Sequence, residues 1–205
     1  PPIRTCYNKF IPANTFSGAF YMRSSVALFS LVLMLAVSQS VLSQTPPCAE
    51  TDYKCRLAAA EAVLKKDPKN PDNYYNIALI FQQMGDFKRA VEMYDMYVAI
   101  PNQKPELLAD GYNNRGISQR ALRKPELAVS DFNKAIELNP AQPGFLINRA
   151  NAYVDLKKND LALADYAKAI AADPNLAFAY AQRGVLQQQL GKNDEAIADL
   201  TKAIE

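Results

Sequence analysis

The chain has 205 residues, with 23 Lys and Arg, 21 Asp and Glu, and no His. The absence of His excludes Ser-His-Asp and Cys-His catalytic pairs, His-ligated metal sites and the HExxH zinc motif. Three of the basic residues and none of the acidic residues precede residue 44, so the chain from residue 44 onward has a net charge of −1. This balance gives no electrostatic basis for nucleic-acid binding.

The N-terminal region has the pattern of a targeting segment. Residues 1–21 start without Met and show no periodicity, and we interpret them as translated upstream sequence that is not part of the natural protein. A charged residue and then an apolar run predict a secretory signal peptide over 22–43, cleaved after Ser43. We therefore expect a secreted or periplasmic protein that has no membrane contact after cleavage. The alternative is an uncleaved signal that anchors the protein in a membrane.

Two of the three cysteines follow the signal peptide, and their spacing predicts a disulfide. Cys6 precedes the signal, which leaves Cys48 and Cys55 as a pair suited to an oxidising compartment. In one continuous helix their Cα atoms would lie about 10.5 Å apart, too far to bridge. Cys48 must therefore precede the helix cap, for which Thr51 and Asp52 are candidates. Two unrelated reduced thiols are the alternative.

From residue 108 onward the chain repeats itself every 34 residues. The repeating columns are Tyr112, Leu146 and Tyr180; Arg115, Arg149 and Arg183; Gly116, Ala150 and Gly184; Ala128, Ala162 and Ala196; Phe132, Tyr166 and Leu200; Ala135, Ala169 and Ala203; and Ile136, Ile170 and Ile204. Apolar residues recur at three- and four-residue steps, so each unit is expected to be two helices and a turn. An earlier unit carries the same columns after a step of 38, and its four extra residues, near 101–105, indicate a loop or a short helix extension.

These columns resemble the tetratricopeptide repeat family, which has a 34-residue period with Gly or Ala, Ala, an aromatic residue, Ala and Pro in this order. The resemblance covers about 72–205, with Tyr or Leu in place of the usual opening Trp. It implies an all-α, right-handed α-α superhelix of stacked helix-turn-helix units. We expect units at 71–102, 109–142, 143–176 and 177–205, the last one truncated, after a disulfide-pinned segment and capping half-repeat at 44–70.

The pattern also places the individual helices and their ends. Helices are expected near 53–66, 73–84, 87–99, 106–121, 126–138, 143–156, 160–172, 177–190 and 194–205. Gly85 and Asp86 are expected to form a turn and a cap, Asp160 and Asp194 to cap their helices, and Pro125 to take a first helical position.

No catalytic site, metal site or cofactor site is expected. Two cysteines cannot build a four-ligand zinc site, and no Gly-rich phosphate loop is present. Asp131, Asp165 and Asp199 recur too far apart for paired-carboxylate chemistry. Each has a Lys three residues later (Lys134, Lys168 and Lys202), so we interpret them as a solvated helix face with local ion pairs.

The resemblance does imply a binding surface, because the first helices of such repeats line a concave face. Asn76, Asn114, Asn148 and Gln182 occupy matching positions there, and similar proteins use an amide column at this place to hydrogen-bond the backbone of an extended peptide. The flanking residues, which differ between units, are expected to give specificity; they are Tyr75, Asn113, Ile147 and Asn151. Solvated polar residues without a ligand are the alternative interpretation.

We therefore expect an exported, non-catalytic scaffold that binds a peptide or a partner protein. The alternative is an accessory arm of a larger enzyme or receptor whose functional domain lies beyond residue 205. The last helix, 194–205, carries an apolar side with no further unit to cover it, so we expect fraying or self-association there.

Overall fold

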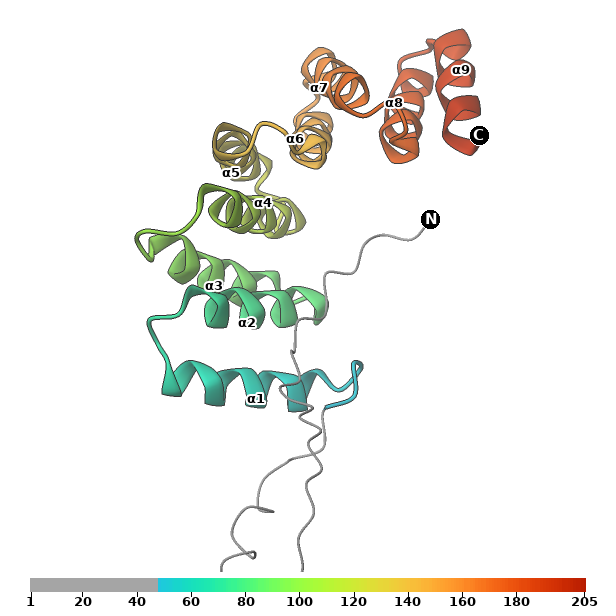
Figure 1. Cartoon of the computed structure of the whole chain (residues 1–205). Coiled ribbons are helices and arrows are strands. Elements are labelled where there is room, and N and C mark those ends of the chain that lie inside the picture. Colours follow the sequence, from blue (N-terminus) through green and yellow to red (C-terminus); the bar gives the residue numbers. More distant parts are fainter. Residues whose placement is uncertain (1–47) are drawn as a thin grey trace, which may run out of the picture. The chain divides into compact units, whose positions relative to one another are not determined.

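The described part of the protein is entirely helical. A computed structural model describes residues 48–205 as nine α-helices, with no strand in that range (Figure 1). The helices are α1 Tyr53–Lys66, α2 Pro71–Gln83, α3 Phe87–Ala99, α4 Pro105–Ala121, α5 Pro125–Leu138, α6 Pro143–Asp155, α7 Asn159–Ala172, α8 Ala177–Gln189 and α9 Asn193–Ile204. Every expected helix is present within two residues of its expected bounds, so the all-α prediction is confirmed. The predicted upstream sequence, signal peptide and cleavage after Ser43 lie outside the described residues.

The helices pack in chain order as a row of hairpins. α2 pairs with α3, α4 with α5, α6 with α7, and α8 with α9, while α1 packs on α2. Contacts of α3 with α4, α5 with α6, and α7 with α8 join successive pairs, and α4 also contacts α6. Because each pair contacts chiefly its neighbours along the chain, the fold is a solenoid.

The four extra residues lengthen one helix and leave the register of the units intact. α4 has 17 residues, whereas α2, α6 and α8 have 13 each. Before it, the Nε2 of Gln103 donates to the carbonyls of Tyr97 and Ile100 at 2.6 and 3.1 Å, which satisfies the end of α3. Of the two alternatives that the sequence left open, a loop or a short helix extension, the structure has the helix extension.

The helix caps agree with the sequence in the first units and differ in the later ones. Asp52 and Asp86 accept hydrogen bonds from the backbone N–H of Cys55 and Arg89 at 3.0 and 3.1 Å, as caps do. Pro125 is the first residue of α5, as predicted. The caps predicted at Asp160 and Asp194 are wrong. α7 and α9 begin one residue before these aspartates, which places both carboxylates inside the first turn. There the positive end of the helix dipole stabilises their negative charge.

One residue in each hairpin turn adopts the left-handed backbone conformation. Gly85 and Gly191 do so with φ of 76° and 74°. The two middle units have Arg123 and Lys157 at the same place, with φ of 60° and 58°. A side chain at such a position has a steric cost that glycine avoids, so the middle turns are less favourable than the outer ones.

Small residues in the first helices receive large side chains from the second helices. Ala128, Phe132 and Ala135 are fully buried, and so is Tyr94 in the first unit. A Cβ built at Gly116 would lie 2.7 Å from the Phe132 ring, so this position needs glycine for the two helices to approach. These contacts agree with the packing that the repeat columns predict.

The recurring aspartates are buried, which corrects the expectation of a solvated face. Asp131, Asp165 and Asp199 are 6%, 3% and 6% exposed. Each aspartate lies on the second helix of its unit and receives two hydrogen bonds from an arginine on the first helix of the same unit. The three arginines are Arg115, Arg149 and Arg183. The partner lies 16 residues upstream on the facing helix, so the lysines three residues away are not the partners. Hydrogen bonding to these carboxylates raises the pKa of Arg149 and of Arg183.

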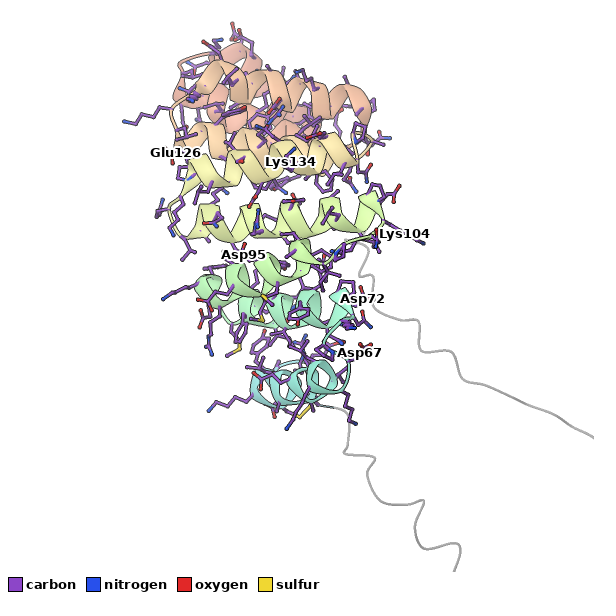
Figure 2. All side chains as sticks on the ribbon, turned by 90° about the vertical axis from the view of Figure 1, so that its left-hand side faces the viewer. Asp67, Asp72, Asp95, Lys104, Glu126 and Lys134 are labelled. Carbon is purple, nitrogen blue, oxygen red and sulfur yellow. A yellow bond between two sulfur atoms is a disulfide. The ribbon has the colours of Figure 1, made fainter. Side chains whose placement is uncertain are left out.

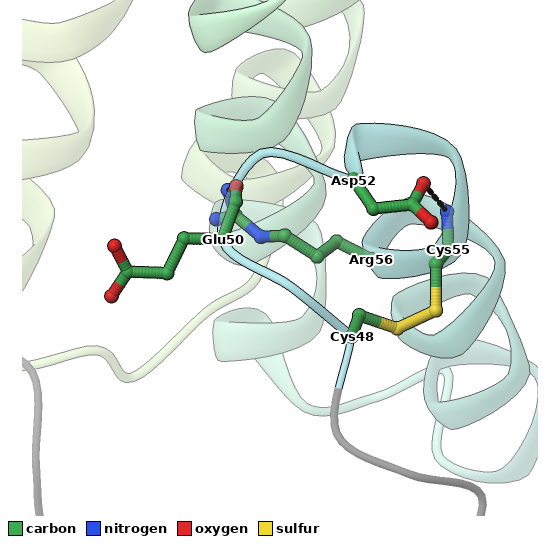
Figure 3. The surroundings of a disulfide bond; sticks show 5 residues. All are labelled: Cys48, Glu50, Asp52, Cys55 and Arg56. Atoms are coloured by element: carbon green, nitrogen blue, oxygen red, sulfur yellow. Dashed lines mark hydrogen bonds between the residues drawn. A yellow bond between two sulfur atoms is a disulfide. The ribbon is translucent and has the colours of Figure 1, made fainter.

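The cysteine pair pins the start of the array. Cys48 and Cys55 are joined with a Cα–Cα distance of 5.7 Å, and Cys48 precedes the Asp52 cap as the geometry required (Figure 3). Arg56 donates from Nη1 to the carbonyl of Glu50 and to Oε1 of Gln83, both at 2.9 Å. The looped segment is therefore tied both to α1 and to the end of α2.

Candidate peptide-binding surface

The predicted amide column lies on the first helices of the four units. Asn76 is on α2, Asn114 on α4, Asn148 on α6 and Gln182 on α8. Asn76 is exposed, and the other three are half-buried. The residue that follows each of them in the chain is Ile77 in the first unit and an arginine paired with a buried aspartate in the others. Because these neighbours are held by packing and ion pairs, the orientation of the column residues on their helices is fixed as well.

Four of the predicted residues, three asparagines and a tyrosine, form a hydrogen-bonded row. Asn148 donates from Nδ2 to Oδ1 of Asn113 at 2.8 Å, and Asn113 donates to Oδ1 of Asn114 at 3.2 Å. Asn114 in turn donates to the hydroxyl of Tyr75 at 2.7 Å. The amide row, defined as Asn148, Asn113, Asn114 and Tyr75, thus joins α6, α4 and α2 across two unit boundaries.

The flanking residues proposed for specificity have different environments. Tyr75 packs its ring against Tyr94 and Tyr97, with centroids 5.8 and 5.2 Å apart. Asn151 accepts a hydrogen bond from the Tyr166 hydroxyl. Ile147 does not belong to the surface: it is 5% exposed and packs within the core of the third unit, which corrects its assignment. Burial of the isoleucine side chain in the core is favoured over its exposure to water, because it removes apolar surface from the solvent.

A pocket of about 120 Å³ opens beside the last member of the column. Its apolar wall comes from Val154 of α6, Tyr166 of α7, and Val185 and Leu186 of α8. The polar lining residues are Arg120, Asn151, Gln182 and Gln189. The sequence did not reveal this pocket, because its depth depends on how the side chains of α6 and α8 pack.

The surface offers recognition chemistry and no reactive group. Burial raises the pKa of Tyr94, Tyr97 and Tyr166, which keeps these phenols neutral. Burial also raises the pKa of Asp110, at the start of the surface on α4. Among residues 48–205, no cluster of three His, Cys, Asp or Glu side chains could hold a metal ion.

Charge is mixed over the outside of the array. In Figure 2 the acidic residues Asp67, Asp72, Asp95 and Glu126 share one face with Lys104 and Lys134. Within the described residues no helix is both long and apolar enough to cross a membrane.

A row of stacked helix hairpins, in which each pair contacts chiefly its neighbours, defines the class of helical-repeat proteins. The chain belongs to the tetratricopeptide repeat family. Models of that repeat match residues 59–92, 109–142, 143–176 and 166–198, together more than half of the chain. Proteins of this family serve as protein-interaction scaffolds, and we assign that general role to this chain.

Solved structures of other proteins share the fold. A structure of MamA is 24% identical with a TM-score of 0.66, over 75% of this chain and 87% of that one. A fragment of MamA from Desulfovibrio magneticus RS-1 is 17% identical with a TM-score of 0.67, over 75% and 85%. YrrB, described as a TPR protein with an unusual peptide-binding site, is 22% identical with a TM-score of 0.60, over 74% and 76%. No curated protein matches the sequence.

Proposed function

We propose that the protein is exported and holds an extended segment of a partner protein or peptide along the concave face of the array. The amide column contacts the backbone of that segment. The observation that carries this proposal is the amide row, which sets three asparagine amides of α4 and α6 and the Tyr75 hydroxyl of α2 in line across three consecutive first helices.

The internal hydrogen bonds leave the amides able to bind. A side-chain amide has two N–H donors and an oxygen with two lone pairs. Asn148 uses one donor in the row, and Asn114 uses one donor and one lone pair. Each therefore keeps a donor and an acceptor for the C=O and N–H groups of a peptide.

The row also lowers the cost of binding. A single such hydrogen bond contributes only about 0.5–1.5 kcal/mol, so several in series are needed to hold a segment. Ordering a free side chain on binding costs about 0.5–1.5 kcal/mol, and the row has already ordered Asn113, Asn114 and Asn148. Backbone contacts of this kind do not depend on the peptide sequence, so specificity must come from other side chains.

The test compares two pairs of asparagine substitutions. Asn114→Ala with Asn148→Ala removes the centre of the column, whereas Asn175→Ala with Asn193→Ala removes two exposed asparagines outside it. We expect the first pair to weaken binding of peptides selected from a random display library by about tenfold or more, and the second pair to leave it unchanged. Equal affinity of both folded variants would refute the role of the column.

Export is supported by the disulfide at the start of the array, since such bonds persist in oxidising compartments. The measurement is the intact mass of the protein from the producing cells. Cleavage after Ser43 and a mass that lacks two hydrogens are expected. Two alkylatable thiols in unreduced material would contradict the export proposal, and retention of 22–43 in a membrane would favour the anchored alternative.

A further inference from the structure

The first helix of the fourth unit, α8, presents a different surface from the first helices of the other units. Phe178, Gln182, Val185 and Gln189 follow one another at four- and three-residue steps and form one stripe along α8. Phe178 is 56% exposed and Val185 is 43% exposed. The residues that match Phe178 in the earlier units are Asp72, Asp110 and Gly144. At this position, therefore, only α8 carries an apolar side chain in place of an acidic residue or glycine.

Two of the four polar residues that line the adjacent pocket, Arg120 and Asn151, are already paired within the protein. Arg120 donates from Nε and Nη2 to the two carboxylate oxygens of Asp155, at 2.6 and 3.3 Å. Asn151 accepts from the Tyr166 hydroxyl. Hence the pocket offers no unpaired charge to an ionic ligand group, and its wall of Val154 and Val185 suits an uncharged apolar group.

Two amides at the pocket have no internal partner. The side chains of Gln182 and Gln189 make no hydrogen bond to any described residue, although both line the pocket. They lie seven residues apart on one face of α8, about 10.5 Å along the helix axis. Amides at this spacing in the pocket lining are free to bond the backbone of a peptide that inserts one side chain into the pocket.

We propose that this pocket, formed by α4, α6, α7 and α8, binds one aliphatic side chain of the partner peptide, with Gln182 and Gln189 bonding the adjacent backbone. The inference rests on the proposed function and adds to it the residue that gives the peptide its specificity. An apolar cavity of about 150 Å³ binds benzene, and this pocket of about 120 Å³ is smaller, so we expect it to take Val, Ile, Leu or Met in preference to an aromatic residue.

The experiment selects linear peptides from a random display library on the purified protein. The selected peptides are expected to share one aliphatic position. A synthetic peptide with this residue replaced by Ala should bind the parent at least about tenfold more weakly. Val185→Asp should weaken the binding of the unaltered peptide to a similar extent. Leu127→Asp, at a side chain that is 51% exposed on α5, is the matched control and should have no effect. Circular dichroism checks that both variants are folded.

A double-mutant comparison makes the result specific. If the anchor enters the pocket, the Ala-substituted peptide should bind the parent and the Val185→Asp variant with equal affinity, because the contact is already lost. Unchanged affinity of the unaltered peptide for Val185→Asp, or enrichment of charged or aromatic anchors, would overturn the pocket assignment. In that case sensitivity to the Asn114 and Asn148 substitutions would still support the amide column. Failure to select any peptide would overturn both proposals.

Discussion

The buried arginine–aspartate pairs can be tested against an exchange that the chain itself contains. The first unit has Ile77 where the third has Arg149, and Met93 where the third has Asp165. Ile77 is 2% exposed, and Met93 packs against the core cluster that contains it. The same fold therefore accommodates an ion pair at these two positions in one unit and two apolar side chains in another. We therefore consider Arg149→Ile, Asp165→Met and the double substitution.

The expected free energies follow from burial. The Asp165 side chain is only 4% exposed, so Arg149→Ile leaves a buried carboxylate without its charged partner and should destabilise by about 3–5 kcal/mol. Asp165→Met should cost less, about 2–3 kcal/mol, because Arg149 is 17% exposed and keeps its 2.7 Å bond to Oδ1 of Asn133. The double variant should lie within about 1 kcal/mol of the parent, since replacing a whole buried pair by apolar residues is often neutral.

Urea denaturation followed by circular dichroism measures each difference. Asp155→Ala provides the control, because its pair with Arg120 is 30% and 41% exposed and should contribute no more than about 1 kcal/mol. The reasoning fails if Arg149→Ile costs less than the control, or if the double variant loses as much as the two single variants together.

Three further predictions use the same denaturation assay or its thermal equivalent. Gly111→Ala should cost about 1–3 kcal/mol, because a Cβ there overlaps the Tyr97 ring, whose hydroxyl is held by the Leu107 carbonyl; Gly144→Ala, with no neighbour closer than 3.8 Å, should not lower the urea midpoint. Lys157→Gly should raise stability by up to about 1 kcal/mol by removing a side chain from φ 58°, and a lower midpoint would contradict this. Burial raises the pKa of Tyr166 to about 12, so its stabilising contribution is complete below the ordinary pKa of about 10 and is lost as the pH rises toward 12. The melting temperature should fall across that window, and Tyr166→Phe should reduce the fall; a pH-independent melting temperature would contradict the assignment.

The sequence predicts the helices well because every unit states the same pattern again. A single apolar stripe is ambiguous, but columns such as Ala128 and Phe132 recur in register and fix where each helix begins and ends within two residues. The turn chemistry is less regular. Lys157 occupies a left-handed position that glycine occupies elsewhere, and no local preference of lysine indicates it.

The sequence failed where the partner lies on another helix. Asp165 has a lysine three residues later, and local helix spacing favours that pair, but the fold brings Arg149 against it from the preceding helix. The recurrence of arginine 16 residues before each aspartate was the signal that could have identified the pair. The prediction that Ile147 lies on the surface was wrong for a related reason. Its column contains tyrosine, asparagine and alanine in the other units, and only the packing shows that the isoleucine side chain is buried.

The arginine column also explains why the last unit boundary differs from the others. Arg115 bonds Asp95 of the preceding unit at 2.7 Å, and Arg149 bonds Asn133 of its preceding unit at the same distance. At the matching place before Arg183 the chain has Ala167, which offers no side-chain acceptor. The boundary between the third and fourth units therefore lacks a link that the two earlier boundaries have. The pocket beside Gln182 opens at this boundary, where the arginine link between the units is missing.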